Sequence, residues 1–219
     1  MEAIEIVTGD DPDSAVIWLH GLGTNGHDFA PIVPELGLPS SMRVRFIFPH
    51  APLLPVTING GHAMPAWYDI RSPDLRQNED EQGIRNSQRR LEALIRHELE
   101  RGIASTRIVL AGFSQGGTIA LHTALRYGVP LAGVLALSTY LPLATSLEVE
   151  ANPANAALTV FMAHGTADDV IPLAQGAASR DLLRKEKYAV EWHEYPMAHS
   201  VCSEEIADIG IWLTRIFAA

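Results

Sequence analysis

Short apolar runs alternate with longer amphipathic segments along most of the chain. Several of the apolar runs are hydrophobic at nearly every position, which is typical of strands buried on both faces of a sheet. Six such runs predict strands, at residues 15–20, 44–48, 107–110, 134–137, 158–162 and 189–195. The pattern therefore predicts a central sheet with both faces covered.

The amphipathic segments have the spacing of helices. They lie at residues 78–101, 114–127, 173–187 and 201–217. The first begins at Asn78 with Glu81 three residues later, a start that resembles a capping box, and Gly102 follows its end. Because strands and helices alternate, we expect an α/β fold with a mostly parallel sheet and helices on both faces, in one domain over residues 1–219.

The segment 51–74 is rich in proline and glycine and has no clear periodicity. A connection of this length is uncommon in a compact domain unless it has a function. Its larger apolar residues suggest one wall of an apolar pocket; they are Leu53, Leu54, Val56, Met64 and Trp67. No insertion is long enough to predict a large helical lid.

Charge and hydropathy indicate which partners and which location to expect. The chain has 16 Lys and Arg against 26 Asp and Glu, a net charge of −10, which disfavours nucleic acid and anionic membranes as partners. No apolar stretch approaches the length of a membrane span, and the N-terminus shows no signal-peptide pattern. We therefore expect a cytoplasmic protein without stable membrane insertion.

The strongest chemical signal is the motif Gly112-Phe113-Ser114-Gln115-Gly116. It follows a predicted strand and opens a predicted helix, which is the context that a G-x-S-x-G nucleophile elbow requires. The glycines leave room for a sharp turn that holds one serine at its apex. The motif predicts Ser114 as the nucleophile of a serine hydrolase with an α/β-hydrolase fold.

A serine hydroxyl needs a base, and in this fold the acid and then the histidine follow the serine along the chain. His199 comes just after the last predicted strand, whereas His193 lies inside it. The acid is expected in the loop after the preceding strand, where Asp168 and Asp169 are adjacent. The motif alone leaves the choice between these two aspartates open.

An oxyanion hole should complete the site. One donor is expected to be the backbone N–H of Gln115, and the other should come from an early strand-to-helix loop, where His20-Gly21-Leu22-Gly23 is found. The single cysteine, Cys202, lies three residues after His199, but no acid or oxyanion loop is assigned to that pair. The histidines show no metal-ligand spacing, so neither a metal nor an organic cofactor is expected.

Several long stretches resemble the phospholipase/carboxylesterase family, which includes small bacterial carboxylesterases and acyl-protein thioesterases. They include WLHGLGTNGHDFAPIVPEL at 18–36, RFIFPHAPLLPVTINGGHAMPAWYDI at 45–70, AGFSQGGTIALHTAL at 111–125, LSTYLP at 137–142, HGTADDVIP at 164–172 and YPMAHSVCSEEI at 195–206. The resemblance implies a triad, oxyanion donors and an acyl-site loop. The implied triad is Ser114, Asp168 and His199, and the implied oxyanion donors are the backbones of Leu22 and Gln115. The loop that carries Trp67 is implied to line the acyl site.

One position departs from the family pattern, because Asp169 stands where relatives often have proline after the acid. The resemblance also makes a homodimer plausible. We expect Trp67, Leu53, Met64 and Val170 to contact the substrate.

The sequence predicts a serine carboxylesterase that hydrolyses short- to medium-chain esters through an acyl-enzyme. An acyl-protein thioesterase or a lysophospholipase is the first alternative, because the same residues serve esters and thioesters. A binding protein that uses the fold without catalysis is the second alternative.

Overall fold

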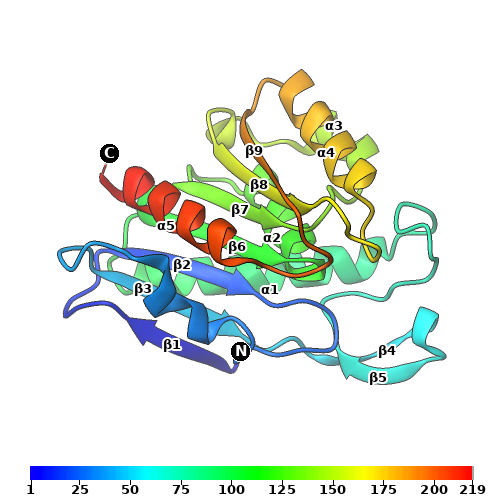
Figure 1. Ribbon diagram of the computed structural model, residues 1–219, viewed down its shortest axis with the longest axis horizontal. Helices are drawn as coiled ribbons and strands as arrows, with labels where there is room; N and C mark the ends of the chain where they lie inside the picture. The colour runs from blue at the N-terminus through cyan, green and yellow to red at the C-terminus, as the bar shows by residue number, and fades with distance from the viewer. Residues whose placement is uncertain (219) are drawn as a thin grey trace.

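A seven-stranded sheet runs through the computed structural model, which describes residues 1–218 (Figure 1). Its order is β1-β3-β2-β6-β7-β8-β9, and all neighbours are parallel except β1, which pairs antiparallel with β3. The strands are β1 (Ala3–Val7), β2 (Ser14–Leu19), β3 (Val44–Pro49), β6 (Ile108–Phe113), β7 (Gly133–Leu137), β8 (Thr159–Gly165) and β9 (Ala189–Tyr195).

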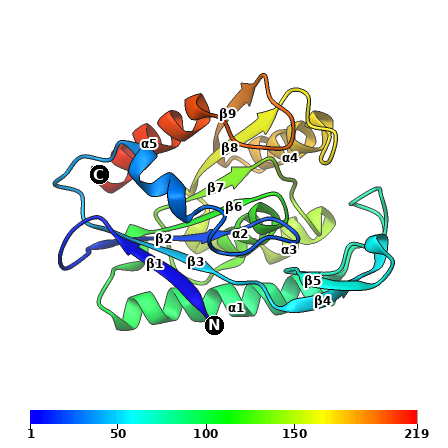
Figure 2. The same cartoon turned by 60° about the horizontal axis from the view of Figure 1, so that its bottom comes forward.

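Helices cover both faces of this sheet, as the alternating pattern predicts. One face packs against α1 (Glu81–Glu100), α2 (Gln115–Arg126) and α4 (Leu173–Lys185), and the other against η1 (Ala30–Leu36) and α5 (Ser203–Ala218). Figure 2 shows α1 and α5 on opposite sides of the sheet. The remaining short elements are α3 (Leu147–Glu150), η2 (Thr57–Asn59), η3 (Ser105–Arg107), η4 (Ala144–Ser146) and η5 (Pro153–Asn155).

Strand β2 is apolar at every position after Ser14, because both of its faces are buried. Successive side chains of a strand point to opposite faces of the sheet. Ile17 and Leu19 join the core beneath α1 and α2, while Val16 and Trp18 join the core beneath η1 and α5. None of the four is more than 1% exposed, so both sets of alternating positions have to be apolar.

Each of the six predicted strands and four predicted helices has a counterpart, with two differences at the edges. Strand β1 was not predicted, because it is an edge strand whose side chains are half-buried or exposed and which carries Glu5 at its centre. The predicted start of α1 was also wrong. Asp80 caps this helix by accepting from the N–H of Gly83 at 3.2 Å, whereas Asn78 adopts φ 56° in the preceding turn.

The segment 51–74 forms a separate antiparallel hairpin of β4 (Leu53–Val56) and β5 (His62–Pro65). Its apolar side chains do not form one wall, since Leu53 is 71% exposed while Val56 is fully buried. The expected absence of a large lid holds for residues 1–218, where the only α-helix outside the two covering layers is the four-residue α3.

None of the helices within residues 1–218 is both long enough and apolar enough to span a bilayer.

Candidate active site

Ser114 occupies the turn between β6 and α2, at the carboxyl end of the central strands (Figure 1). Its backbone angles, φ 54° and ψ −123°, lie in a region that side-chain-bearing residues rarely adopt. The flanking glycines make this turn possible. A Cβ on Gly116 would stand 2.3 Å from the carbonyl oxygen of Leu19, and one on Gly112 would stand 2.3 Å from the carbonyl carbon of Gly116.

Neighbouring strands hold this strained turn in place. The N–H of Ser114 donates to the carbonyl oxygen of Leu137 at 2.8 Å. The carbonyl oxygen of Ser114 accepts from the hydroxyl of Thr139 at 2.8 Å and from the N–H of Thr118 at 3.0 Å. Thr139 lies directly after β7, within a stretch quoted for the family resemblance, but its contact with the nucleophile turn was not anticipated.

His199 connects the serine to a buried carboxylate. Its Nε2 lies 2.8 Å from Ser114 Oγ, and its Nδ1 lies 2.7 Å from Asp168 Oδ2. Because a carboxylate only accepts, Nδ1 carries the imidazole proton and donates it to Asp168. Nε2 is then left with its lone pair facing the serine hydroxyl, which is the tautomer that a general base needs.

The structure distinguishes the two adjacent aspartates. The side chain of Asp168 is fully buried, and its Oδ1 accepts from the N–H groups of Val170 at 3.0 Å and Ile171 at 2.8 Å. Asp169 is exposed and makes none of these contacts. The geometry therefore places Asp168, the residue that the family resemblance favoured, against His199.

A second imidazole supports the acid loop. His164 Nε2 lies 2.7 Å from the carbonyl oxygen of Ile171 and 3.5 Å from Asp168 Oδ2. Burial lowers the pKa of His164, which keeps the ring neutral. Sequence reasoning did not assign it a role, although it stands in the same HGxxD stretch as Asp168.

The loop after β2 has a fixed peptide orientation. His20 Nε2 accepts the N–H of Ala51 at 3.0 Å, so the proton of the ring is on Nδ1, which donates to the carbonyl oxygen of Gly21 at 2.7 Å. Thr24 Oγ1 donates to the same oxygen at 3.1 Å. Burial lowers the pKa of His20, which favours the neutral ring that this arrangement requires.

These two bonds orient the next backbone N–H. The carbonyl of Gly21 and the N–H of Leu22 belong to one trans peptide and point in opposite directions. Leu22 lines the cavity above Ser114. Within residues 1–218, neither its N–H nor that of Gln115 donates to a protein acceptor, so both expected oxyanion donors are unused.

Two adjoining cavities form the cleft. One, of about 280 Å³, lies above Ser114 and is lined by Leu22 and Val170 among others. The second, of about 390 Å³, lies between η1 and α5. Both cavities share the lining residues Asp28, Phe113 and His199, so the imidazole stands where they meet.

Of the four residues expected to contact the substrate, three do not line the two cavities of the cleft. Val170 lines the cavity above Ser114, but Leu53 projects from the exposed hairpin. Met64 is half-buried on β5 and accepts from Asn59 Nδ2 at 3.3 Å. Trp67 is only 2% exposed, and its ring packs among the apolar residues of the core.

The position of Trp67 nevertheless links the site to the core. Its indole N–H donates to the carbonyl oxygen of His20 at 2.9 Å, and its backbone N–H donates to Gln115 Oε1 at 2.8 Å. Gln115 Nε2 in turn donates to the carbonyl oxygen of Tyr68 at 2.7 Å. These bonds tie the two loops that carry the expected oxyanion donors to one another.

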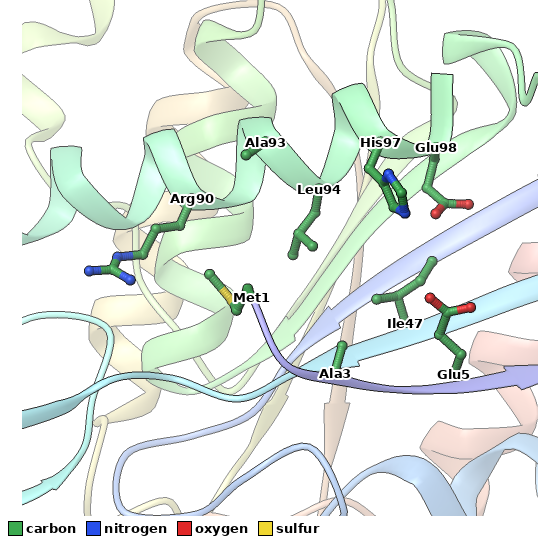
Figure 3. Close-up of a pocket in the computed structure, with 9 residues that line it drawn as sticks. All are labelled: Met1, Ala3, Glu5, Ile47, Arg90, Ala93, Leu94, His97 and Glu98. Atoms are coloured by element: carbon green, nitrogen blue, oxygen red, sulfur yellow. The ribbon is translucent and has the colours of Figure 1, made fainter. Parts of the chain in front are cut away.

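A further cavity of about 470 Å³, larger than either of these two, lies away from this cleft, between α1, the edge strand β1 and its neighbour β3. Figure 3 shows Leu94 and Ile47 facing its apolar centre, with Glu98 and His97 from the same helix at one end. Neither Ser114 nor its two polar partners line it.

Other nucleophile and metal possibilities find no support. The thiol of Cys202 is half-buried, and burial raises its pKa, so it is not an activated thiolate. The described residues contain no group of three or more His, Cys, Asp or Glu side chains placed to hold a metal ion.

Comparisons with known proteins identify the family of the chain. A family model described as Phospholipase/Carboxylesterase matches residues 1–216. The chain is 44% identical over 211 residues to acyl-protein thioesterase 1 of Neurospora crassa, covering 92% of this chain and 86% of that protein. It is 40% identical over 227 residues to acyl-protein thioesterase 1 of Mycosarcoma maydis, covering 97% and 95%.

Among solved structures, acyl-protein thioesterase 2 of Zea mays superposes with a TM-score of 0.86 at 28% identity, covering 98% of both chains.

Proposed function

Because this chain belongs to the phospholipase/carboxylesterase family and has the α/β-hydrolase fold, we propose that it hydrolyses acyl thioesters, and oxygen esters with the same residues, through an acyl-enzyme on Ser114. The observation that carries this proposal is the position of His199, which contacts Ser114 Oγ at 2.8 Å and Asp168 at 2.7 Å. In this arrangement the base is in its working tautomer before any substrate binds.

Acylation begins when His199 Nε2 takes the proton of the Ser114 hydroxyl while Oγ attacks the substrate carbonyl carbon. The carbonyl oxygen becomes an oxyanion, and the N–H groups of Leu22 and Gln115 donate to it. As the C–S or C–O bond breaks, His199 gives its proton to the leaving sulfur or oxygen. Asp168 accepts from Nδ1 throughout and stabilises the imidazolium.

Deacylation repeats these events with water. His199 removes a proton from a water molecule that attacks the acyl carbon, a second oxyanion forms, and the proton returns to Ser114 Oγ as the carboxylic acid is released. Every step uses groups of this chain, so the proposed reaction needs only substrate and water.

The comparisons favour thioesters over the oxygen esters that the sequence alone suggested. Both curated relatives described above are named acyl-protein thioesterases, at 40% and 44% identity. The cleft also lies at the surface without a large helical lid in residues 1–218, so a carbonyl carried on a protein segment can reach Ser114. Hydrolysis of short- to medium-chain esters remains the second candidate, because the same machinery serves it.

Matched substrates test the proposal. We expect turnover of an S-octanoyl thioester, with a lower kcat/KM for the oxygen ester of the same acyl chain and for lysophosphatidylcholine. Ser114→Ala should abolish all three activities while the fold is retained. A fluorophosphonate should label Ser114 alone. A folded wild-type protein that hydrolyses none of the substrates would instead support a binding role, and label on another residue would overturn the nucleophile assignment.

A further inference from the structure

The cavity between η1 and α5 has no role in the reaction described above, although it opens onto the catalytic imidazole. Its lining includes apolar side chains from three parts of the fold: Phe29 and Ile32 at the start of η1, Phe113 at the end of β6, and Ile206 on α5. The ring centroids of Phe113 and His199 lie 4.7 Å apart. A group bound in this cavity would therefore lie beside His199.

The chemistry of acylation indicates which part of the substrate fits there. The leaving atom receives its proton from His199 Nε2, so it must lie within hydrogen-bond reach of that nitrogen. The carbonyl oxygen is directed to the other side, toward Leu22 in the cavity above Ser114. The chain attached to the leaving atom thus extends past His199, into the cavity that shares this residue.

The charges of the lining favour one kind of leaving group. Asp28 and Glu35 are exposed carboxylates on the η1 side, and neither makes an ion pair with any residue in 1–218. The linings of the two cavities contain no lysine or arginine. An unneutralised carboxylate pair beside an apolar wall attracts a cation and repels an anion, and salt weakens both effects.

We propose that this cavity is a leaving-group subsite that selects thiols with an apolar stem and a positive charge, as a cysteine flanked by basic residues presents. Asp28 and Glu35 determine the charge preference, while Ile32 and Ile206 hold the stem. The inference rests on the proposed thioesterase function, because it assigns the non-acyl half of that substrate.

A series of three octanoyl thioesters isolates the leaving group, since the acyl chain stays constant. The leaving thiols are thiocholine, which is cationic, 2-mercaptoethanol, which is neutral, and 3-mercaptopropionate, which is anionic. The three thiols differ in intrinsic reactivity, so a single kcat/KM value does not isolate the effect of charge. For each protein we therefore take the ratio of kcat/KM for the cationic thioester to kcat/KM for the anionic thioester. The ratio of a variant is then compared with the ratio of the wild type.

The double variant Asp28→Asn, Glu35→Gln should lower this ratio about five- to tenfold, the size expected from two exposed charges. The kcat/KM for the neutral thioester is measured beside it, so that a general loss of activity is separated from a change in charge preference. The matched control is Asp10→Asn, Asp11→Asn, which removes two exposed charges from the turn between β1 and β2. It should leave the ratio unchanged. Raising the salt concentration should lower the wild-type ratio in the same direction.

Equal ratios in the wild type and the Asp28, Glu35 variant would overturn the subsite, as would an equal change in the control variant. A filling variant tests the apolar half. Val201 also lines this cavity, just before α5. Val201→Trp should raise KM for a hexanethiol thioester more than for a methanethiol thioester, and equal effects on both would contradict a stem-binding role. Failure of the proposed function is distinguishable, because the wild type would then not hydrolyse the neutral thioester at all.

Discussion

Two regions of this molecule combine a cavity with a buried carboxylate, and they use the carboxylate differently. In the cavity against α1, Glu98 is 2% exposed and pairs with Arg45 at 3.2 Å and Arg101 at 3.1 Å. In the cleft, the buried Asp168 contacts no arginine or lysine, and one of its oxygens faces His199.

The difference teaches that cavity volume does not identify a reactive site. The cavity against α1 is larger, at about 470 Å³ against about 280 Å³ above Ser114. In the larger cavity the buried charge is neutralised by fixed cations, so it stabilises the fold. In the smaller one the buried charge faces an imidazole that contacts a hydroxyl group, which is the arrangement that the proposed proton transfer requires.

The largest expected effect comes from removing the nucleophile. Ser114→Ala should lower kcat for an acyl thioester by about 10⁴-fold or more, because it removes the hydroxyl that His199 Nε2 contacts. Cys202→Ser is the control and should retain wild-type turnover. Steady-state kinetics on both proteins measure the two values of kcat. Substantial activity in Ser114→Ala would show that Ser114 is not the nucleophile, and the contrast between the two cavities would then fail.

The two neighbouring aspartates provide the next largest contrast. Asp168→Asn should lower kcat about a hundredfold or more, because the amide no longer enforces the working imidazole tautomer. Asp169→Asn should stay within about threefold of the wild type, since an exposed carboxylate acts weakly. Kinetics with circular dichroism as a folding control decide the matter, and the opposite order of effects would refute the assignment.

A substitution of His20 tests whether its buried imidazole fixes the orientation of the loop that carries Leu22. His20→Gln removes the defined Nδ1–H donor to Gly21, so the N–H of Leu22 loses its fixed direction. We expect kcat to fall about ten- to a hundredfold with little change in KM, because the oxyanion exists only in the transition state. Thr24→Val, which removes the weaker bond, should have a smaller effect. A rise in KM at unchanged kcat would contradict this role.

Glu205 extends the comparison to a third buried carboxylate. It pairs with neither an arginine nor a histidine within residues 1–218. Burial raises the pKa of Glu205 to about 8, from the ordinary glutamate value of 4.5. Between these two values only the folded protein holds the proton, so stability falls as pH rises from about 4.5 to about 8.

Glu205→Gln cannot ionise and should remove this loss. We expect the variant to gain about 1–3 kcal/mol of unfolding free energy over the wild type at pH 8.5, and much less near pH 5. Denaturant unfolding at the two pH values measures the difference. A gain that does not depend on pH would show that ionisation of Glu205 is not its cause.

The smallest effect belongs to the cavity against α1. Arg90→Ala and His97→Ala change exposed residues of its rim and should leave kcat/KM within about twofold of the wild type. A tenfold loss in either variant would show that this cavity communicates with the cleft.

The sequence alone identifies some residues of the candidate site better than others. Ser114 was predictable because its turn depends on local sterics, with glycines two positions to each side. His199 followed from the strand order. The choice between Asp168 and Asp169 could not follow from local pattern, since it depends on which side chain the loop directs inward.

Residues that act through tertiary contacts were missed or misplaced. Thr139 follows the neighbouring strand β7 and donates to the carbonyl oxygen of Ser114, a contact that no motif encodes. Trp67 was expected in the substrate wall because the hairpin segment lacks periodicity. Its indole instead packs in the core and donates to the loop after β2. The fold was more predictable, because β2 and its neighbours are buried on both faces.

The strained backbone of Ser114 also bears on how such a protein changes under selection. Its conformation, φ 54° and ψ −123°, costs about 1–3 kcal/mol for a residue with a side chain, whereas glycine adopts it without steric conflict. Folding by itself therefore gives no advantage to a serine at this position; only turnover does. A mutant library sorted for abundance or heat resistance would lose its nucleophile by drift, so evolution experiments on this chain need an activity screen in every round.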